Sequence, residues 1–184
     1  MSLAFLLLLA VDVAGHVTGH DSKTDIVAHA PGFLDKGKQF EPRLVRPDAK
    51  GNFAFKGLPK EFSIIEAVSW HGEKLNYAWV EWKGQPQVEL AMAAVKPVKG
   101  KVVVAGAGAI PKGLLVTCPG DVTSKVGADG SFDLGILNPN WYEIELEHLP
   151  PGATYTIAVG KTAVPAHEVD LRRLTGDLLI IIKK

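Results

Sequence analysis

Short runs in which apolar and polar residues alternate recur along the whole chain, between clusters of glycine, proline and aspartate. Helical spacing of apolar residues, three and four positions apart, is nearly absent. Alternation with a period of two predicts β-strands, because successive side chains of a strand point to opposite faces of the sheet. The predicted strands are residues 11–18, 25–30, 39–45, 52–55, 62–70, 76–82, 88–92, 98–104, 114–118, 131–134, 142–146, 155–159, 168–171 and 178–183.

The breaks between these strands have the sequences of tight turns. Asp129-Gly130 is a hairpin dipeptide, since both residue types tolerate positive φ. Residues 47–51, 84–86 and 149–152 each combine proline with glycine. Many short strands at regular spacing, joined by such turns, predict an all-β fold of antiparallel β-sandwiches, prealbumin-like or immunoglobulin-like, with little or no helix.

The pattern of strands and turns occurs twice. Each copy has a glycine and a valine two positions apart in an early strand, and a glycine and a phenylalanine two positions apart after a later turn. These residues are Gly15, Val17, Gly51 and Phe53 in the first copy and Gly100, Val102, Gly130 and Phe132 in the second. The first copy has the longer spacing, 36 residues (15 to 51) against 30 (100 to 130), and loops tolerate such insertions. We therefore predict two β-sandwich domains, residues 11–94 and 95–184.

Both copies also carry the same order of motifs. A V-x-G-x-V strand precedes a D-x-x-G-x-F or D-G-x-F turn, and a Leu-Pro turn and an aromatic strand follow. The motifs are residues 13–17, 48–53 and 58–59 in the first copy and residues 98–102, 129–132 and 149–155 in the second. From about residue 11 onward the chain resembles two carboxypeptidase regulatory-like domains, which are transthyretin-like β-sandwiches also grouped with carbohydrate-binding-like folds.

This resemblance extends to tandem copies in secreted proteins of soil bacteria. It implies modules that accompany other activities, and it does not imply the peptidase activity itself. One departure lies in the first copy, where Leu58-Pro59 continues as Lys60-Glu61 and lacks the Pro-Gly usual in the family.

Residues 3–11 form an unbroken apolar run at the N-terminus. Nine residues are too few to span a membrane, which takes about 20, but they suit the apolar core of a secretory signal. No lysine or arginine precedes the run, and cleavage after Ala10 or Ala14 would have Leu8 or Asp12 where a small residue is expected. We predict that residues 1–10 are a signal-peptide remnant and that the protein is extracytoplasmic: periplasmic, on the cell surface or secreted. The alternative is a hydrophobic first strand.

The net charge and composition of the chain restrict the classes of partner that it can bind. Twenty basic and twenty acidic residues give a net charge of zero, which disfavours nucleic acid and anionic membranes as partners. Apolar residues are 47% of the chain, enough for a core. Cys118 is the one cysteine, so an intramolecular disulfide and a cysteine-based zinc site are excluded. Because Cys118 ends an apolar strand, we predict that its thiol is buried.

No motif indicates catalysis or a bound metal. The six histidines lack the spacing of a zinc site, and His16 and His20, four apart in a strand, are separated by about 13 Å. A Gly-x-Ser-x-Gly motif is absent. Asp48 and Asp129 provide one carboxylate per turn, too few for calcium. We therefore predict a protein that is not an enzyme and has no catalytic residues, metal or cofactor.

One cluster of aromatic residues is a candidate binding site. Tyr77 and Trp79 share one face of a predicted strand, opposite Ala78 and Val80, so their rings are expected on the outer surface. Exposed flat rings can stack on the apolar face of a sugar. The alternative is packing in the core or between domains. The candidate ligand-binding residues are Trp70, Tyr77, Trp79 and Trp82.

Three functional classes remain open from the sequence, and an enzyme is the class with the least support. The first is a non-catalytic module for binding or scaffolding at the cell envelope, with envelope proteins or polysaccharide as partners. The second is a carbohydrate-binding module that uses the surface aromatics of the first domain. The fold resemblance is compatible with both, and a glycan-array screen beside a pull-down from an envelope extract would distinguish them.

Overall fold

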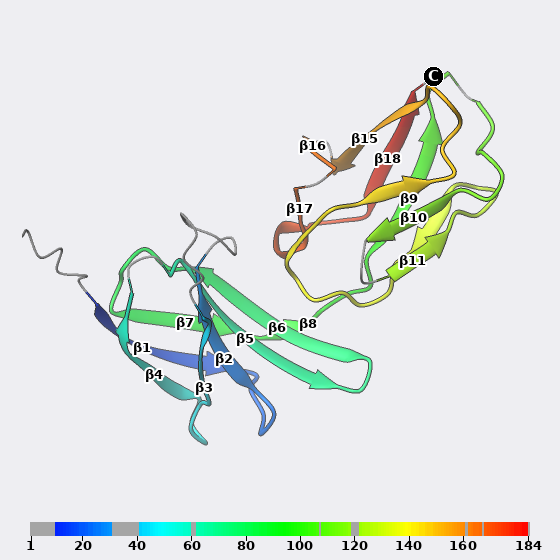
Figure 1. Ribbon diagram of the computed structural model, residues 1–184. Helices are drawn as coiled ribbons and strands as arrows, with labels where there is room; N and C mark the ends of the chain where they lie inside the picture. The colour runs from blue at the N-terminus through cyan, green and yellow to red at the C-terminus, as the bar shows by residue number, and fades with distance from the viewer. Residues whose placement is uncertain are drawn as a thin grey trace, which may run out of the picture. The chain divides into compact units, whose positions relative to one another are not determined.

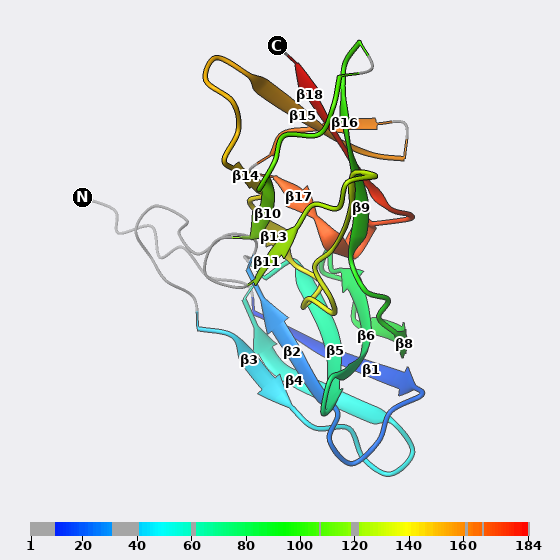
Figure 2. The same ribbon diagram turned by 90° about the vertical axis from the view of Figure 1, so that its right-hand side faces the viewer.

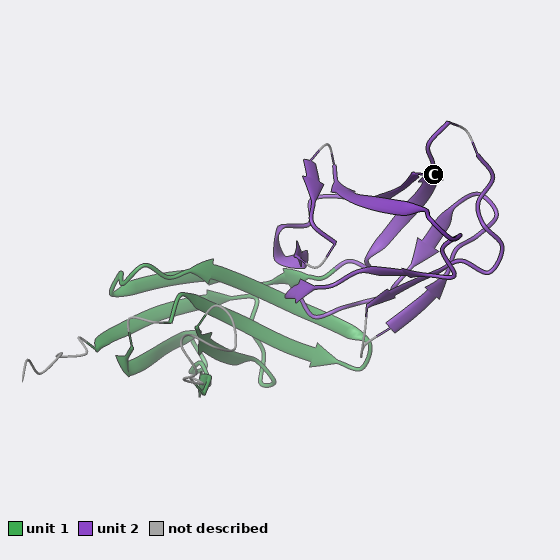
Figure 3. Ribbon diagram, turned by 45° about the horizontal axis from the view of Figure 1, so that its top comes forward, with its two compact units in different colours: residues 1–95 green, residues 96–184 purple. Residues whose placement is uncertain are grey.

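The computed structural model describes residues 10–30, 41–59, 62–106, 108–118, 122–160, 162–166 and 168–183 (Figure 1). It confirms the prediction of an all-β fold, because the described residues form strands and a single helical turn of three residues. The chain divides into two compact units, residues 1–95 and residues 96–184 (Figure 3). We call them unit 1 and unit 2 and describe each separately.

Unit 1 is a sandwich of two sheets. Its strands are β1 (Val11–Thr18), β2 (Asp25–His29), β3 (Arg43–Val45), β4 (Asn52–Leu58), β5 (Ile64–His71), β6 (Lys74–Glu81), β7 (Gln87–Ala91) and β8 (Ala93–Ala94). One sheet has the order β4-β1-β7, with β1 antiparallel to β4 and parallel to β7. The other has the order β3-β2-β5-β6-β8 and is antiparallel, with β2 beside β5 (Figure 2). Alternate residues of both sheets form one core, including Val13, Val17, Ile26, Phe53, Phe55, Ile65, Val88 and Leu90.

Unit 2 contains three sheets around a second core. Its elements are β9 (Lys99–Val104), β10 (Leu115–Cys118), β11 (Val122–Lys125), β12 (Ser131–Asp133), β13 (Trp141–Tyr142), β14 (Glu145–Glu147), β15 (Thr154–Val159), β16 (Thr162–Val164), β17 (Val169–Asp170), the 3-10 turn η1 (Leu171–Arg173) and β18 (Leu178–Lys183). The sheet orders are β12-β9-β18-β15-β16, β11-β10-β14 and β13-β17. The core includes Val102, Leu114, Val116, Cys118, Phe132, Ile144, Ile157, Ile180 and Ile182.

Each unit has a phenylalanine packed on a strand glycine. Gly15 of β1 pairs with Phe53 of β4, and a Cβ at Gly15 would overlap the Phe53 ring. Gly100 of β9 pairs with Phe132 of β12 in the same way, and a Cβ there would overlap that ring. Only glycine permits such a close approach.

Each unit also has a tight turn closed by a second glycine. Gly51 and Gly130 have φ of 86° and 85°, a conformation that glycine adopts without strain. The Val17 N–H donates to the Gly51 carbonyl at 2.9 Å, and the Val102 N–H donates to the Gly130 carbonyl at 2.7 Å. The turn therefore anchors the first strand of each unit.

Some predicted strands differ from those observed. The predicted strand 142–146 is divided between β13 and β14, and the predicted strand 168–171 ends in η1 because the Asp170 carboxylate caps that turn. β8, β11 and β16 were missed, since they are short or lack apolar alternation. The apolar N-terminal run lies outside the described residues except for its last two positions, and the last of these begins β1.

Candidate functional site

The predicted aromatic cluster lies on the hairpin formed by β5 and β6. The two strands pair over eight residues on each side, with Ala67 opposite Ala78 and Glu66 opposite Trp79. Ala78 belongs to the core of unit 1, so Trp79 and Tyr77, its neighbours in the strand, point to the other face of the sheet. The predicted division of the strand between two faces is therefore correct.

The expectation that the Tyr77 ring is exposed is wrong. The residue is only 8% exposed, although it does not belong to the core cluster. Its hydroxyl donates a hydrogen bond of 2.7 Å to Oε2 of Glu66, which lies on the neighbouring strand. A buried tyrosine hydroxyl requires such a partner, and Glu66 provides it.

Trp82 is likewise unable to present its ring, because it is part of the core of unit 1. Its indole N–H donates to the Gln85 carbonyl at 2.7 Å, and its backbone N–H donates to the Ser63 carbonyl at 2.7 Å. Trp79 is half-buried. Trp70, near the end of β5, is 41% exposed and is the most accessible ring of the four predicted residues.

Glu66 connects Tyr77 to a histidine that the sequence did not single out. The Nε2 atom of His29 lies 3.6 Å from Oε1 of Glu66, and this nitrogen is buried without a hydrogen bond. Glu66 and His29 are both partly buried on the non-core side of the sheet. The three residues come from β2, β5 and β6, so strand pairing alone brings them together.

The sequence also missed a cluster of Asp21, Ser69 and His71, the residue types of a hydrolytic triad. The Ser69 hydroxyl lies 3.0 Å from both carboxylate oxygens of Asp21, and Nε2 of His71 lies 2.7 Å from Oδ2 of Asp21. The same Nε2 lies 3.1 Å from the Ser69 hydroxyl oxygen. In a triad the histidine contacts serine and aspartate through different nitrogens. Here one nitrogen meets both, and Ser69 is buried, so the cluster is not arranged for nucleophilic attack.

Asp21 instead closes a turn at the start of β2. The hydrogen bond from His71 and the one from the Lys23 N–H lower the pKa of Asp21 to about 2. The hydroxyl of Ser69 contributes to the same lowering of the pKa. The ionised carboxylate thereby joins the turn to the end of β5, which is a structural role.

The other side chains that could ligate a metal ion do not lie together. Nε2 of His16 lies 3.0 Å from the Lys50 carbonyl oxygen, whereas Nδ1 of His20 lies 3.0 Å from the Val17 carbonyl oxygen. Within the described ranges, no group of three or more histidine, cysteine, aspartate or glutamate side chains could hold a metal ion. Cys118 is buried in the core of unit 2, which confirms its predicted burial.

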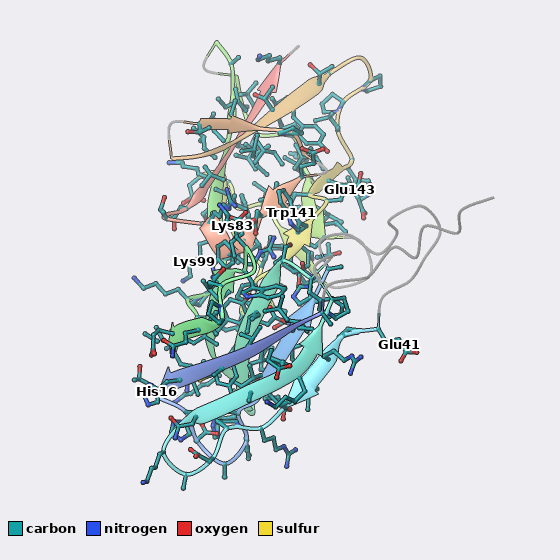
Figure 4. All side chains as sticks on the ribbon, turned by 90° about the vertical axis from the view of Figure 1, so that its left-hand side faces the viewer. His16, Glu41, Lys83, Lys99, Trp141 and Glu143 are labelled. Atoms are coloured by element: carbon teal, nitrogen blue, oxygen red, sulfur yellow. The ribbon has the colours of Figure 1, made fainter. Side chains whose placement is uncertain are left out.

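Unit 2 contains an exposed tryptophan that the sequence analysis did not select. Trp141 in β13 is 51% exposed, and it lies with Glu143 on the same stretch of unit 2 (Figure 4). The guanidinium carbon of Arg172 lies 5.6 Å from the centre of the Trp141 ring. The sequence feature that could have identified Trp141 is the aromatic pair Trp141 and Tyr142, which follows a turn rich in asparagine and proline.

Comparisons with known proteins assign no family to this chain. No family model matches it, and no curated protein matches its sequence. In the part of the chain that the structure describes, no helix is long and apolar enough to cross a membrane. The contacts described above are therefore the basis for assigning a function.

Proposed function

We propose that the chain is a tandem pair of carboxypeptidase regulatory-like modules that bind or scaffold at the cell envelope and catalyse no reaction. One observation carries this proposal: both units have the same glycine–phenylalanine contact and the same glycine turn. The glycines and phenylalanines that make these contacts belong to the sequence motifs on which the family resemblance rests. Such modules hold a binding surface on a rigid sandwich, so the function lies in side chains outside the core.

The absence of catalysis is supported by the way in which the reactive residue types are used. The Ser69 hydroxyl is occupied by Asp21, and Nε2 of His71 meets the same carboxylate. A fluorophosphonate probe, which labels activated serines, should therefore leave the protein unlabelled. Labelling that is lost in Ser69→Ala would contradict this part of the proposal.

The extracytoplasmic location rests on the apolar run at residues 3–11. Expression of the full chain in its source organism, followed by cell fractionation and N-terminal sequencing, tests it directly. We expect the protein in the periplasmic, surface or secreted fraction. Recovery in the cytoplasm with an intact N-terminus would contradict the proposed location.

Binding itself is tested by co-sedimentation of the purified protein with an envelope fraction from the source organism. We expect saturable binding that persists at moderate salt, because the protein has no net charge to drive nonspecific adsorption. Heat-unfolded protein is the control. Equal sedimentation of folded and unfolded protein, or no sedimentation at all, would contradict the proposal.

A second candidate function is carbohydrate binding through the aromatics of unit 1. The supporting observation is that Trp70 is exposed and lies on the same face of the sheet as Trp79. The two rings are four positions apart across the paired strands, a separation of about 13 Å along the sheet. Loss of polysaccharide retention in Trp70→Ala would favour this candidate over a protein-binding role.

A further inference from the structure

Trp141 is the most exposed aromatic residue that the structure describes in either unit. Single exposed hydrophobic side chains are common on protein surfaces, so the 51% exposure of this indole becomes informative only together with the contacts around it. The other exposed large hydrophobic residues in the described ranges are Leu44 in β3 and Trp70 in β5. Among the residues of unit 2 that the structure describes, Trp141 is therefore the one exposed large hydrophobic side chain.

A buried ion pair supports the Trp141 ring. Arg172 donates from Nε to Oδ1 of Asp170 at 2.8 Å and from Nη2 to Oδ2 at 3.1 Å. The side chains of Arg172 and Asp170 are only 4% and 7% exposed. Asp170 lies opposite Trp141 in the pairing of β13 with β17, and the Arg172 guanidinium is positioned over the indole. The guanidinium that contacts the ring is thus itself positioned by two hydrogen bonds to a buried carboxylate.

Asp170 also caps η1, so the ion pair has a structural role besides its contact with the indole. Removing two charges from water often costs as much as their attraction returns, so a buried pair is weak evidence of a role in stability. The attraction between the Arg172 cation and the indole favours the ring orientation in which the two groups face each other. A restricted ring loses less conformational entropy when a ligand binds to it.

The surroundings of the Trp141 ring indicate the class of ligand. Asn138, Asn140, Glu143 and Arg173 are exposed polar residues in the adjoining segments. A protein interface needs a contiguous apolar centre, which a single indole with polar neighbours does not supply. A sugar ring fits better, because one face is apolar C–H and its rim carries hydroxyls for amide, carboxylate and guanidinium groups.

We propose that Trp141 is a stacking platform for a pyranose ring of an envelope polysaccharide, held in place by the Arg172–Asp170 pair. The proposal rests on the envelope-binding function proposed above and names its ligand class. It assigns the sugar contact to unit 2, whereas the sequence placed the candidate aromatics in unit 1.

Retention of the full-length protein in native gels that contain soluble polysaccharide tests the platform. The panel comprises neutral glucans, uronic-acid polymers and chitosan, which separates neutral from charged pyranosides. Trp141→Ala should weaken retention about tenfold or more, because a central aromatic carries much of such a binding energy. Trp141→Phe should retain part of the affinity. Leu44→Ala is the control, an exposed large hydrophobic residue in β3 of unit 1, and should leave retention unchanged.

Treatment of the envelope fraction separates failure of this inference from failure of the proposed function. Periodate destroys vicinal diols of sugars, whereas protease removes proteins. Binding that is lost after periodate and in Trp141→Ala supports the sugar platform. Binding that survives periodate but not protease overturns the sugar platform and leaves a protein-binding module. No binding to the untreated fraction overturns both. Retention in the gels that is equal in Trp141→Ala and wild type also overturns the platform.

Discussion

Units 1 and 2 begin with the same strand pairings and then diverge at one connection. In each, the first strand pairs antiparallel with the strand after the glycine turn and parallel with a late strand, as β1 does with β4 and β7 and β9 does with β12 and β18. The divergence concerns the strand that follows β5 in unit 1 and β14 in unit 2. β6 of unit 1 pairs with β5, whereas β15 of unit 2 pairs with β18 in the opposite sheet.

The connecting residues explain this difference. β5 and β6 are joined by Gly72 and Glu73 alone, with Gly72 at a φ of 62°, so the chain folds back on the same sheet. β14 and β15 are separated by six residues that include Pro150 and Pro151. Proline lacks the N–H that a continuing hairpin ladder needs, so the chain leaves the sheet. Turn chemistry therefore decides which sheet receives the strand.

The two units also differ in where they present aromatic residues. In unit 1 they lie on or directly beside the β5–β6 hairpin. There the Tyr77 hydroxyl donates a hydrogen bond to Glu66, and Trp82 is buried in the core. In unit 2 the segment between β12 and β14 instead contributes β13, which pairs with β17 and carries Trp141. Equivalent sandwiches thus place their exposed rings on different elements.

The largest expected effect distinguishes the core and surface tryptophans of unit 1. Trp82→Ala removes a buried indole and should reduce the free energy of unfolding by roughly 3–5 kcal/mol. Trp70→Ala, at the exposed end of the same hairpin, should change it by under about 1 kcal/mol. Urea unfolding followed by tryptophan fluorescence measures both. Equal losses in the two variants would contradict the difference in burial.

A second test asks whether the two cores are independent. Gly15→Val places methyl groups where the Phe53 ring lies and should destabilise unit 1 by roughly 3 kcal/mol. Unit 2 should keep its stability, and Cys118 reports on it because the thiol is buried there. The rate of thiol labelling should therefore match that of wild type. Faster labelling of Cys118 would mean that the two units unfold together.

A fragment of residues 96–184 complements this test. It contains the whole core of unit 2 and should fold alone, with a strand-rich circular dichroism spectrum. An unfolded fragment would show that unit 2 depends on unit 1.

Cys118→Ser should have a smaller effect, confined to unit 2. The substitution places a hydroxyl in an apolar core and should cost on the order of 1–3 kcal/mol. Cys118→Ala is the control, since it removes the sulfur without adding a polar group. The transition of unit 2 in urea, followed by circular dichroism of the fragment, measures both costs. A serine variant as stable as the alanine variant would contradict the penalty for the hydroxyl.

The sequence predicted the strands that alternate or consist of strongly β-forming apolar residues, and it missed short strands with neither pattern. Residues 11–18, which largely alternate, match β1, and the apolar run of residues 178–183 matches β18. β11 was missed because an edge strand, held by β10 alone, needs few apolar residues. At the site, alternation correctly placed Tyr77 and Trp79 on one face. It could not predict that Tyr77 is buried, because its partner Glu66 lies eleven residues away in the sequence.

The hydrogen bond between Ser69 and Asp21 could not be predicted from the local sequence for the same reason. These residues are 48 positions apart, and only the pairing of β2 with β5 brings them together. Trp141 was overlooked because its supporting cation, Arg172, lies in η1, far from Trp141 along the sequence. Local alternation therefore predicts faces, and long-range pairing decides which side chains meet.

The smallest effect concerns the pH dependence of the stability of unit 1. The hydrogen bonds from His71, Lys23 and Ser69 lower the pKa of Asp21 from 3.8 to about 2. A carboxyl whose pKa is lower in the folded state stabilises the protein above the pKa of the unfolded chain, and this contribution is lost as the pH falls from about 4 to about 2. The stability of unit 1 should therefore decrease over this interval.

Asp21→Asn should flatten this decrease, because its amide does not ionise. Asp177→Asn, an exposed change in unit 2, is the control and should leave the pH dependence of unit 1 as in wild type. Urea midpoints between pH 2 and pH 5, followed by tryptophan fluorescence, provide the measurement, since three of the four tryptophans lie in unit 1. A slope in Asp21→Asn as steep as in wild type would show that another carboxylate, and not the link between the β2 turn and β5, governs the acid sensitivity of this unit.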